Sequence, residues 1–107
     1  MAGKAVFHHF GVPDAAKREG AMYMEAAGVH VTDPEKHPYR VEFLRFEKNC
    51  PMPREIVENA HAAYLVSDID DALKGCQVIL PKTDLGELYI AFIKDGAAVI
   101  ELMQKKG

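Results

Sequence analysis

Short segments in which apolar and polar residues alternate recur along the chain, and alternation with a period of two is typical of half-buried β-strands. The clearest is residues 39–47, where Glu42, Leu44 and Phe46 fall on one face and the residues between them fall on the other. The same reasoning, together with β-branched and aromatic residues, predicts strands at residues 4–12, 29–32, 61–67, 76–80, 88–94 and 97–104. The chain is therefore expected to be rich in β-structure.

Two segments are predicted to be helical. Residues 13–27 begin with Pro13, continue with Ala, Met, Lys, Arg and Glu, and stop at Gly28, all of which favour a helix. Residues 67–75 open with Ser and Asp, which cap helices, and close with a glycine. Proline and polar residues predict a loop at 33–38, turns at 81–84 and 95–96, and a connector at 48–59. The sequence thus predicts an α+β protein.

The order of these elements nearly repeats. The second half reads strand, helix, strand, strand, strand, and the first half reads strand, helix, strand, strand. We therefore predict one domain over residues 1–107, made of two modules at about residues 1–50 and 60–107 with the connector at 48–59 between them. A module of about fifty residues buries too little apolar surface to be stable alone, so both are expected to share one sheet.

The repeat aligns two histidines and two glutamates. His9 and His61 each lie in a strand that precedes a predicted helix, and Glu42 and Glu101 each lie inside an apolar strand. A carboxylate in such a strand is costly unless it is paired or binds a cation. Two imidazoles and two carboxylates can hold one divalent cation and leave positions open for substrate. His8 competes with His9 for this place, because neighbouring residues of a strand face opposite sides.

Two further alternatives stay open from the residues alone. Glu47 is a rival to Glu42, and an edge-strand carboxylate beside Arg40 or Arg45 would need no metal. Glu101 is the least ambiguous of the set, because it is flanked by apolar residues. Cys50 is one of only two cysteines, too few and too far apart for a disulfide scaffold, so both are interpreted as structural thiols.

Four stretches, in this order, resemble the vicinal oxygen chelate superfamily, which includes glyoxalase I, extradiol dioxygenases and the bleomycin-resistance proteins. They are residues 9–14 (HFGVPD), 22–28 (MYMEAAG), 61–70 (HAAYLVSDID) and 91–103 (AFIKDGAAVIELM). The resemblance implies two βαβββ modules that form one curved mixed sheet around a cleft. It also implies that His9, Glu42, His61 and Glu101 hold a metal ion there.

The function that the resemblance implies is that of a divalent-metal-dependent lyase or isomerase of the glyoxalase type. The metal would chelate a small oxygenated substrate and stabilise an enolate or oxyanion, with Glu101 or Glu42 as the catalytic base. Two His with two Glu suits Zn²⁺, Ni²⁺, Co²⁺ or Mn²⁺ better than the iron of a dioxygenase. The alternatives are a metal-independent module that binds a small molecule or antibiotic, as the bleomycin-resistance branch does, and a domain that has become purely structural.

The composition limits the classes of molecule that the protein is expected to bind. The 107 residues carry 13 Lys and Arg against 16 Asp and Glu, a formal net charge of −3, which argues against nucleic acid or an anionic membrane as the main partner. The N-terminus lacks the apolar core of a signal peptide and no apolar run is long enough to span a bilayer, so a cytoplasmic location is expected. Because so short a chain leaves little for a lid, we also expect a homodimer.

Overall fold

The computed structural model describes residues 4–107, so the start of the N-terminal stretch considered for a signal peptide lies outside the described residues. The strands are β1 (Val6–Pro13), β2 (Met22–Met24), β3 (Val29–Val31), β4 (Val41–Phe46), β5 (His61–Leu65), β6 (Gln77–Asp84), β7 (Leu88–Asp95) and β8 (Ala98–Lys105). Short helices occur at α1 (Arg54–Glu58) and α2 (Ile69–Ala72), with 3₁₀ turns at η1 (Glu25–Ala27) and η2 (Pro34–Lys36). This is an α+β fold with few helices.

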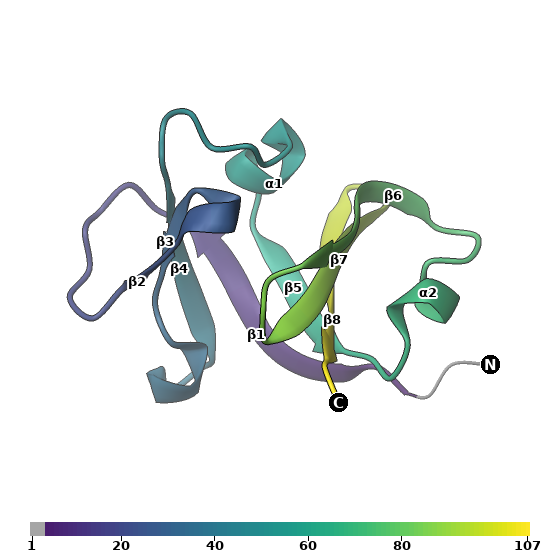
Figure 1. Cartoon of the computed structure of the whole chain (residues 1–107). Coiled ribbons are helices and arrows are strands. Elements are labelled where there is room, and N and C mark those ends of the chain that lie inside the picture. Colours follow the sequence, from purple (N-terminus) through teal and green to yellow (C-terminus); the bar gives the residue numbers. More distant parts are fainter. Residues whose placement is uncertain (1–3) are drawn as a thin grey trace.

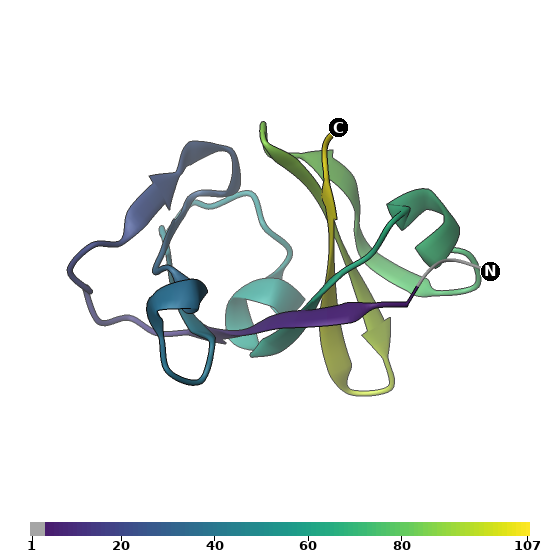
Figure 2. The ribbon, with the colours of Figure 1, turned by 90° about the horizontal axis from the view of Figure 1, so that it is seen from below.

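All eight strands belong to one mixed sheet in the order β2-β3-β4-β1-β5-β8-β7-β6. At its middle β1 pairs antiparallel with β5, while β1 pairs parallel with β4 and β5 pairs parallel with β8. The sheet curls into a half-barrel, with β2–β4 on one side and β6–β8 on the other (Figure 1). Seen from below, α1 lies between the two sides (Figure 2).

The core lies in three clusters. Two occupy the concave face: one around Ile90 and Phe92 with Ile56 of α1, and one around Val29 and Leu44. Phe46 and Met52 pack against both clusters and so join the two sides of the half-barrel. The third cluster fills the space between α2 and the outer face of β7 and β8. The concave face is thus apolar and only partly filled by α1.

The predicted helix at residues 13–27 is wrong. Pro13 ends β1, residues 15–20 are exposed without regular structure, Gly20 has a positive φ of 81°, and Met22–Met24 forms strand β2. β2 pairs antiparallel with β3 and thereby extends the sheet. Helix propensity is a weak preference that tertiary contacts override, and this segment has no apolar stripe along which a helix could pack.

The second half follows the predicted order of strand, helix and three strands. Asp68 caps α2 by accepting a hydrogen bond from the N–H of Asp71, although the helix is shorter than the predicted residues 67–75. The turn expected at residues 81–84 is also wrong, because β6 runs through Pro81 to Asp84. β6 is an edge strand with irregular pairing, and edge strands tolerate proline because its missing N–H can face solvent.

Several further predictions can be compared with the structure. The connector contains the short helix α1, and strand β4 carries Glu42, Leu44 and Phe46 on one face, which lines the concave side. Cys50 and Cys76 are both free thiols. No helix within residues 4–107 is long and apolar enough to cross a membrane.

Candidate metal centre

The register of the central strands brings the four predicted residues together in two neighbouring rows. One row crosses β4, β1 and β5 and contains Glu42, Gly11 and His61; the other crosses β1, β5 and β8 and contains His9, Ala63 and Glu101. In each row a small residue separates the histidine from the glutamate. The two rows are adjacent on the same face, because residues two apart in a strand point to the same side.

Gly11 makes room for His61. A Cβ atom at Gly11 would lie 2.1 Å from Cε1 and 2.3 Å from Nε2 of His61, far inside van der Waals contact. The imidazole of His61 therefore lies directly over the Gly11 backbone and is 3% exposed. Ala63, fully buried at the matching place in the other row, leaves similar but smaller room beside His9.

We expect Gly11→Ala to destabilise the protein by about 1–3 kcal/mol, as overpacking of a core does. The added methyl group can be accommodated only if the His61 ring moves. In a His61→Ala background the same substitution should cost almost nothing, because its clashing partner is gone. Urea denaturation of the wild type, both single variants and the double variant measures this coupling. If the losses of unfolding free energy in the two single variants add up to the loss in the double variant, the His61 ring does not occupy the space over Gly11.

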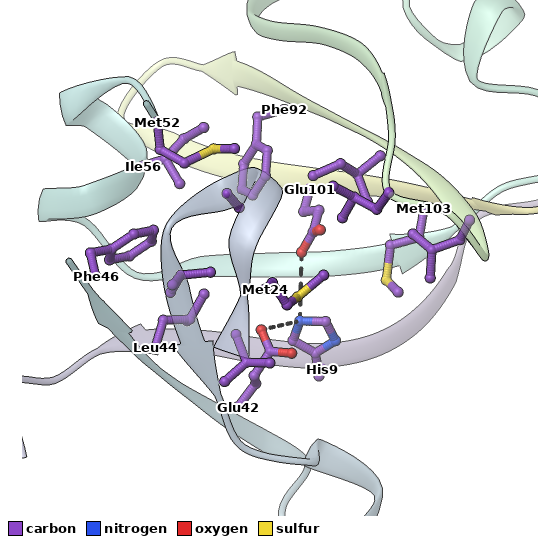
Figure 3. Close-up of a pocket in the computed structure, with 16 residues that line it drawn as sticks. His9, Met24, Glu42, Leu44, Phe46, Met52, Ile56, Phe92, Glu101 and Met103 are labelled. Carbon is purple, nitrogen blue, oxygen red and sulfur yellow. Dashed lines mark ion pairs between the residues drawn. The ribbon is translucent and has the colours of Figure 1, made fainter. Parts of the chain in front are cut away.

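The polar atoms converge at one end of the half-barrel. Nε2 of His61 lies 3.1 Å from Oε1 of Glu101, Nε2 of His9 lies 3.3 Å from Oε1 of Glu42, and the same His9 atom lies 3.6 Å from Oε1 of Glu101. Figure 3 shows His9 between the two carboxylates. Glu101 thus faces both imidazoles, whereas Glu42 faces one, and both histidines are buried.

The charges in this cluster depend on one another. Burial opposes a charge on His9, but the carboxylates of Glu101 and Glu42 outweigh burial and raise its pKa to about 9. Burial also opposes the charge on Glu101, yet His61 and His9 hold the pKa of that carboxyl well below its usual range. Without a metal, the cluster is therefore an ion-pair network in which His9 carries a proton that the carboxylates hold in place.

His8 contacts the far side of the His9 ring. The pairing of β1 with β5 shifts between Phe7 and His9, and this bulge brings Nδ1 of His8 to 2.8 Å from Nδ1 of His9. Burial, His9 and Arg40 lower the pKa of His8, so a neutral His8 accepts the Nδ1–H of His9. Of the two histidines only His9 lines the cavity, as expected, although the bulge brings their rings into contact.

Arg40 holds this bulge from the next strand. Its side chain donates a hydrogen bond to the carbonyl of His8, and its own carbonyl accepts one from the N–H of Phe10. Arg40 is also the one non-glycine residue with positive φ, 58°, among residues 4–107, a conformation that costs energy and is retained where surrounding contacts enforce it. His9 is therefore held in orientation both by a neighbouring ring and by a fixed backbone.

A cavity of about 180 Å³ opens in front of His9, Glu42 and Glu101. The rest of its wall is apolar and comes from both sides of the half-barrel: Met24, Ala27, Val29, Val31, Leu44, Phe46, Met52, Ile56, Leu85, Leu88, Ile90, Phe92 and Met103. Figure 3 shows His9, Glu42 and Glu101 grouped together, with Phe92 beside Glu101 and with Phe46 and Met52 farther away. His61 does not line the cavity; it lies behind Glu101 and packs its ring edge against Phe92, with ring centroids 5.0 Å apart.

Glu47, the alternative to Glu42 in the sequence, lies outside the cluster. Glu47 forms an ion pair with His30 on the exposed surface, 2.7 Å between Oε2 and Nε2, and does not reach the cavity. The sequence did not lead us to predict the role of Gly11, the His8–His9 contact or the methionines of the cavity wall. Of these only Gly11 left a signal in the sequence, because a glycine inside an apolar strand often marks a close approach.

The residues present fit a divalent cation. One ligand atom each from His9, Glu42 and His61 lies within 4.8 Å of the others, so these three side chains are close enough together to hold one ion. Within the described chain, Nε2 of His9 and Nδ1 of His61 are buried without a hydrogen bond, and Nε2 of His9 faces two carboxylates with which it could share an ion. Imidazole and carboxylate together suit Zn²⁺, Ni²⁺, Co²⁺ and Mn²⁺.

The fold occurs in another protein. A hypothetical protein from Bacillus halodurans C-125, known from its crystal structure, is similar over 98% of this chain and 97% of that chain, with a TM-score of 0.73 and 17% sequence identity. At this identity the likeness concerns the fold alone. No family model matches the chain, and no curated protein does either. The arrangement of eight strands in a half-barrel is thus shared, while the chemistry of the cluster must be argued from its own residues.

Proposed function

We propose that this protein is a divalent-metal-dependent lyase or isomerase of the glyoxalase type. One observation carries the proposal: two imidazoles and two carboxylates from four strands lie together, and three of these side chains, His9, Glu42 and Glu101, line an apolar cavity. Burying four such groups without function would be expensive. A cation bound there would offset that cost and would have a substrate-sized space beside it.

The topology supports a relationship to the vicinal oxygen chelate superfamily. In each half of the sheet, the first strand pairs in parallel with the last, β1 with β4 and β5 with β8. We therefore infer two modules of the same ancestry, the second being βαβββ and the first having an extended segment with β2 where its helix would be. Exposed Val6, Phe7 and Phe10 on β1 are consistent with the homodimer that we include in the proposal.

His9, Glu42, His61 and Glu101 would hold the metal ion. When bound, the cation would act as a Lewis acid that stabilises negative charge developing on the oxygens of a substrate. The apolar walls exclude water, which strengthens electrostatic interactions at the polar end. His9 would bind through Nε2, because its Nδ1 is already engaged by His8.

We assign the role of catalytic base to Glu42. Its carboxylate faces one imidazole and lines the cavity, whereas the carboxylate of Glu101 is held between two imidazoles. Glu42 is therefore freer to turn toward a substrate and to accept a proton from a carbon next to a carbonyl group. Glu101 remains in place and keeps both histidines oriented.

Adding a cation should stabilise the folded protein. At a metal concentration of about 100 times the Kd, binding adds about 2.7 kcal/mol, which for a domain of this size raises Tm by roughly 10–20 °C. Differential scanning calorimetry of chelator-treated protein with Zn²⁺, Ni²⁺, Co²⁺ or Mn²⁺ measures this shift. Mg²⁺, which prefers oxygen ligands, serves as the control. Equal Tm values with and without all four metals would contradict the proposal.

The contact between His8 and His9 predicts a further effect on metal affinity. Groups that hydrogen-bond a metal-binding histidine typically contribute about 10–100-fold to affinity, so His8→Phe should weaken binding by that factor. His8→Gln should recover most of it, because the amide oxygen can accept the Nδ1–H of His9. Isothermal titration calorimetry with the preferred metal compares the two variants. If both bind the metal as tightly as the wild type does, His8 does not contribute to metal affinity.

A second candidate function is metal-independent binding of a small molecule, and the apolar cavity wall favours it. The two candidates differ in the requirement for a metal. Tight binding of a ligand by chelator-treated protein, together with the absence of any metal-dependent proton transfer, would select this second function.

A further inference from the structure

We propose that the ligand of this cavity is a small uncharged molecule, about the size of one ring, with an apolar body and two adjacent oxygens at one end. The proposal rests on the metal site for the oxygens, but the apolar body follows from the cavity itself. Three features of the cavity carry it: its volume, its charge and the distribution of polar groups along it.

The volume limits the size of the ligand. An apolar cavity of about 150 Å³ is known to accommodate one benzene molecule, and the cavity here measures about 180 Å³. A ligand of about ten non-hydrogen atoms therefore fits, whereas a peptide or nucleotide conjugate would extend into solvent. Met24, Met52 and Met103 line the cavity and are each half-buried, and the flexibility of methionine allows the walls to adapt to the shape of the body.

The charges in the cavity wall argue against a ligand whose apolar part carries a negative charge. No lysine or arginine occurs among its lining residues in the described part of the chain. A divalent cation would balance the carboxylates of Glu42 and Glu101 and leave the metal-bound cavity neutral. A remote carboxylate or phosphate on the ligand would then be buried against Leu44, Phe46 or Phe92 with no opposite charge, which costs several kcal/mol.

The polar groups also fix how the ligand lies. His9, Glu42 and Glu101 occupy one end of the cavity, and the walls beyond them are hydrocarbon and thioether (Figure 3). The oxygens of a ligand must point to the polar end, and its apolar body must lie between the two sides of the half-barrel. An α-hydroxyketone that carries a single ring has this shape.

Three probes separate these features. 2-Hydroxyacetophenone has adjacent oxygens and a ring, 4-(hydroxyacetyl)benzoate adds a carboxylate at the far end of the ring, and hydroxyacetone lacks the ring. We expect 2-hydroxyacetophenone to bind at least about 100-fold more tightly than the benzoate and at least about tenfold more tightly than hydroxyacetone. Isothermal titration calorimetry on the full chain, both metal-loaded and chelator-treated, measures the three affinities.

A substitution in the cavity wall should reduce the preference for 2-hydroxyacetophenone over the benzoate. Leu88 lines the cavity and is half-buried at the start of β7, so Leu88→Lys places an ammonium group in the apolar part of the cavity wall. We expect this variant to bind the benzoate at least tenfold more tightly than the wild type does. Leu88→Met, which keeps the wall apolar, should leave the preference unchanged.

The outcomes distinguish this inference from the proposed function. Preference for 2-hydroxyacetophenone in chelator-treated protein that also fails to bind metal would support the ligand class and refute the metal-dependent activity. A benzoate that binds the metal-loaded wild type as tightly as 2-hydroxyacetophenone would overturn the ligand class while leaving the metal site standing. Failure of all three probes to bind either form, or equal binding of hydroxyacetone, would also overturn it.

Discussion

Glu101→Gln is expected to weaken metal binding by more than about 100-fold, because a directly coordinating carboxylate should contribute more than the outer hydrogen bonds that give about 10–100-fold. Oε1 of Glu101 lies 3.1 Å from His61 Nε2 and 3.6 Å from His9 Nε2, so this oxygen links both histidines to one point. The glutamine keeps the shape of the side chain and removes its charge. Titration calorimetry and the metal content of purified protein measure the effect.

The surface pair of Glu47 and His30 supplies a matched control. It has the same chemistry as the buried cluster, with 2.7 Å between Oε2 and Nε2, but Glu47 is exposed. Glu47→Gln should leave metal affinity unchanged. Circular dichroism of the metal-free variants checks that both remain folded. Full metal occupancy and unchanged affinity in folded Glu101→Gln would show that this carboxylate is not a ligand.

Glu42→Gln is expected to slow proton transfer by about 10²–10⁴-fold, the usual contribution of a general base. The reaction is exchange of the protons on the carbon between the carbonyl and hydroxyl groups of 2-hydroxyacetophenone, followed by NMR in D₂O with metal-loaded protein. A proton leaves the carbon for a Glu42 carboxylate oxygen, and a deuteron from solvent replaces it. An amide cannot accept that proton, so the CH₂ signal should persist in the variant.

Metal occupancy must be matched for this comparison, since Glu42 is also a proposed ligand. Measuring exchange at a metal concentration that saturates the variant separates loss of the base from loss of the metal. The Glu47→Gln control should catalyse proton exchange in 2-hydroxyacetophenone at the same rate as the wild type. An exchange rate in saturated Glu42→Gln equal to that of the wild type would move the role of base to Glu101, the other carboxylate at the polar end of the cavity.

The sequence predicted that His9, Glu42, His61 and Glu101 lie together, and it predicted this better than it predicted the local structure. Histidine and glutamate inside apolar strands stand out because burying them is costly, and a twofold repeat makes their coincidence visible. The pairing of Gly11 with both Glu42 and His61 could not be predicted, because it depends on which strands become neighbours. The four residues were therefore identifiable, but their arrangement in two rows was not.

The errors have physical causes in particular residues. Residues 13–27 are rich in good helix formers, but Met22–Met24 finds hydrogen-bond partners in β3, and residues 15–20 remain exposed. Alternation along β1 correctly predicted that only one of His8 and His9 lines the cavity, but it could not predict the bulge that brings the two rings into contact. The cavity wall combines methionines from β2, the connector and β8, so no local pattern could reveal it.

The position of a bound metal ion is the most direct test of the proposed metal site. Crystals of the protein grown with Zn²⁺, Ni²⁺, Co²⁺ or Mn²⁺ can be measured at the absorption edge of the metal, where anomalous scattering locates the ion. We predict one strong peak about 2.0–2.2 Å from Nε2 of His9 and His61 and from carboxylate oxygens of Glu42 and Glu101. A metal-saturated crystal with no peak among these four side chains would contradict the central claim.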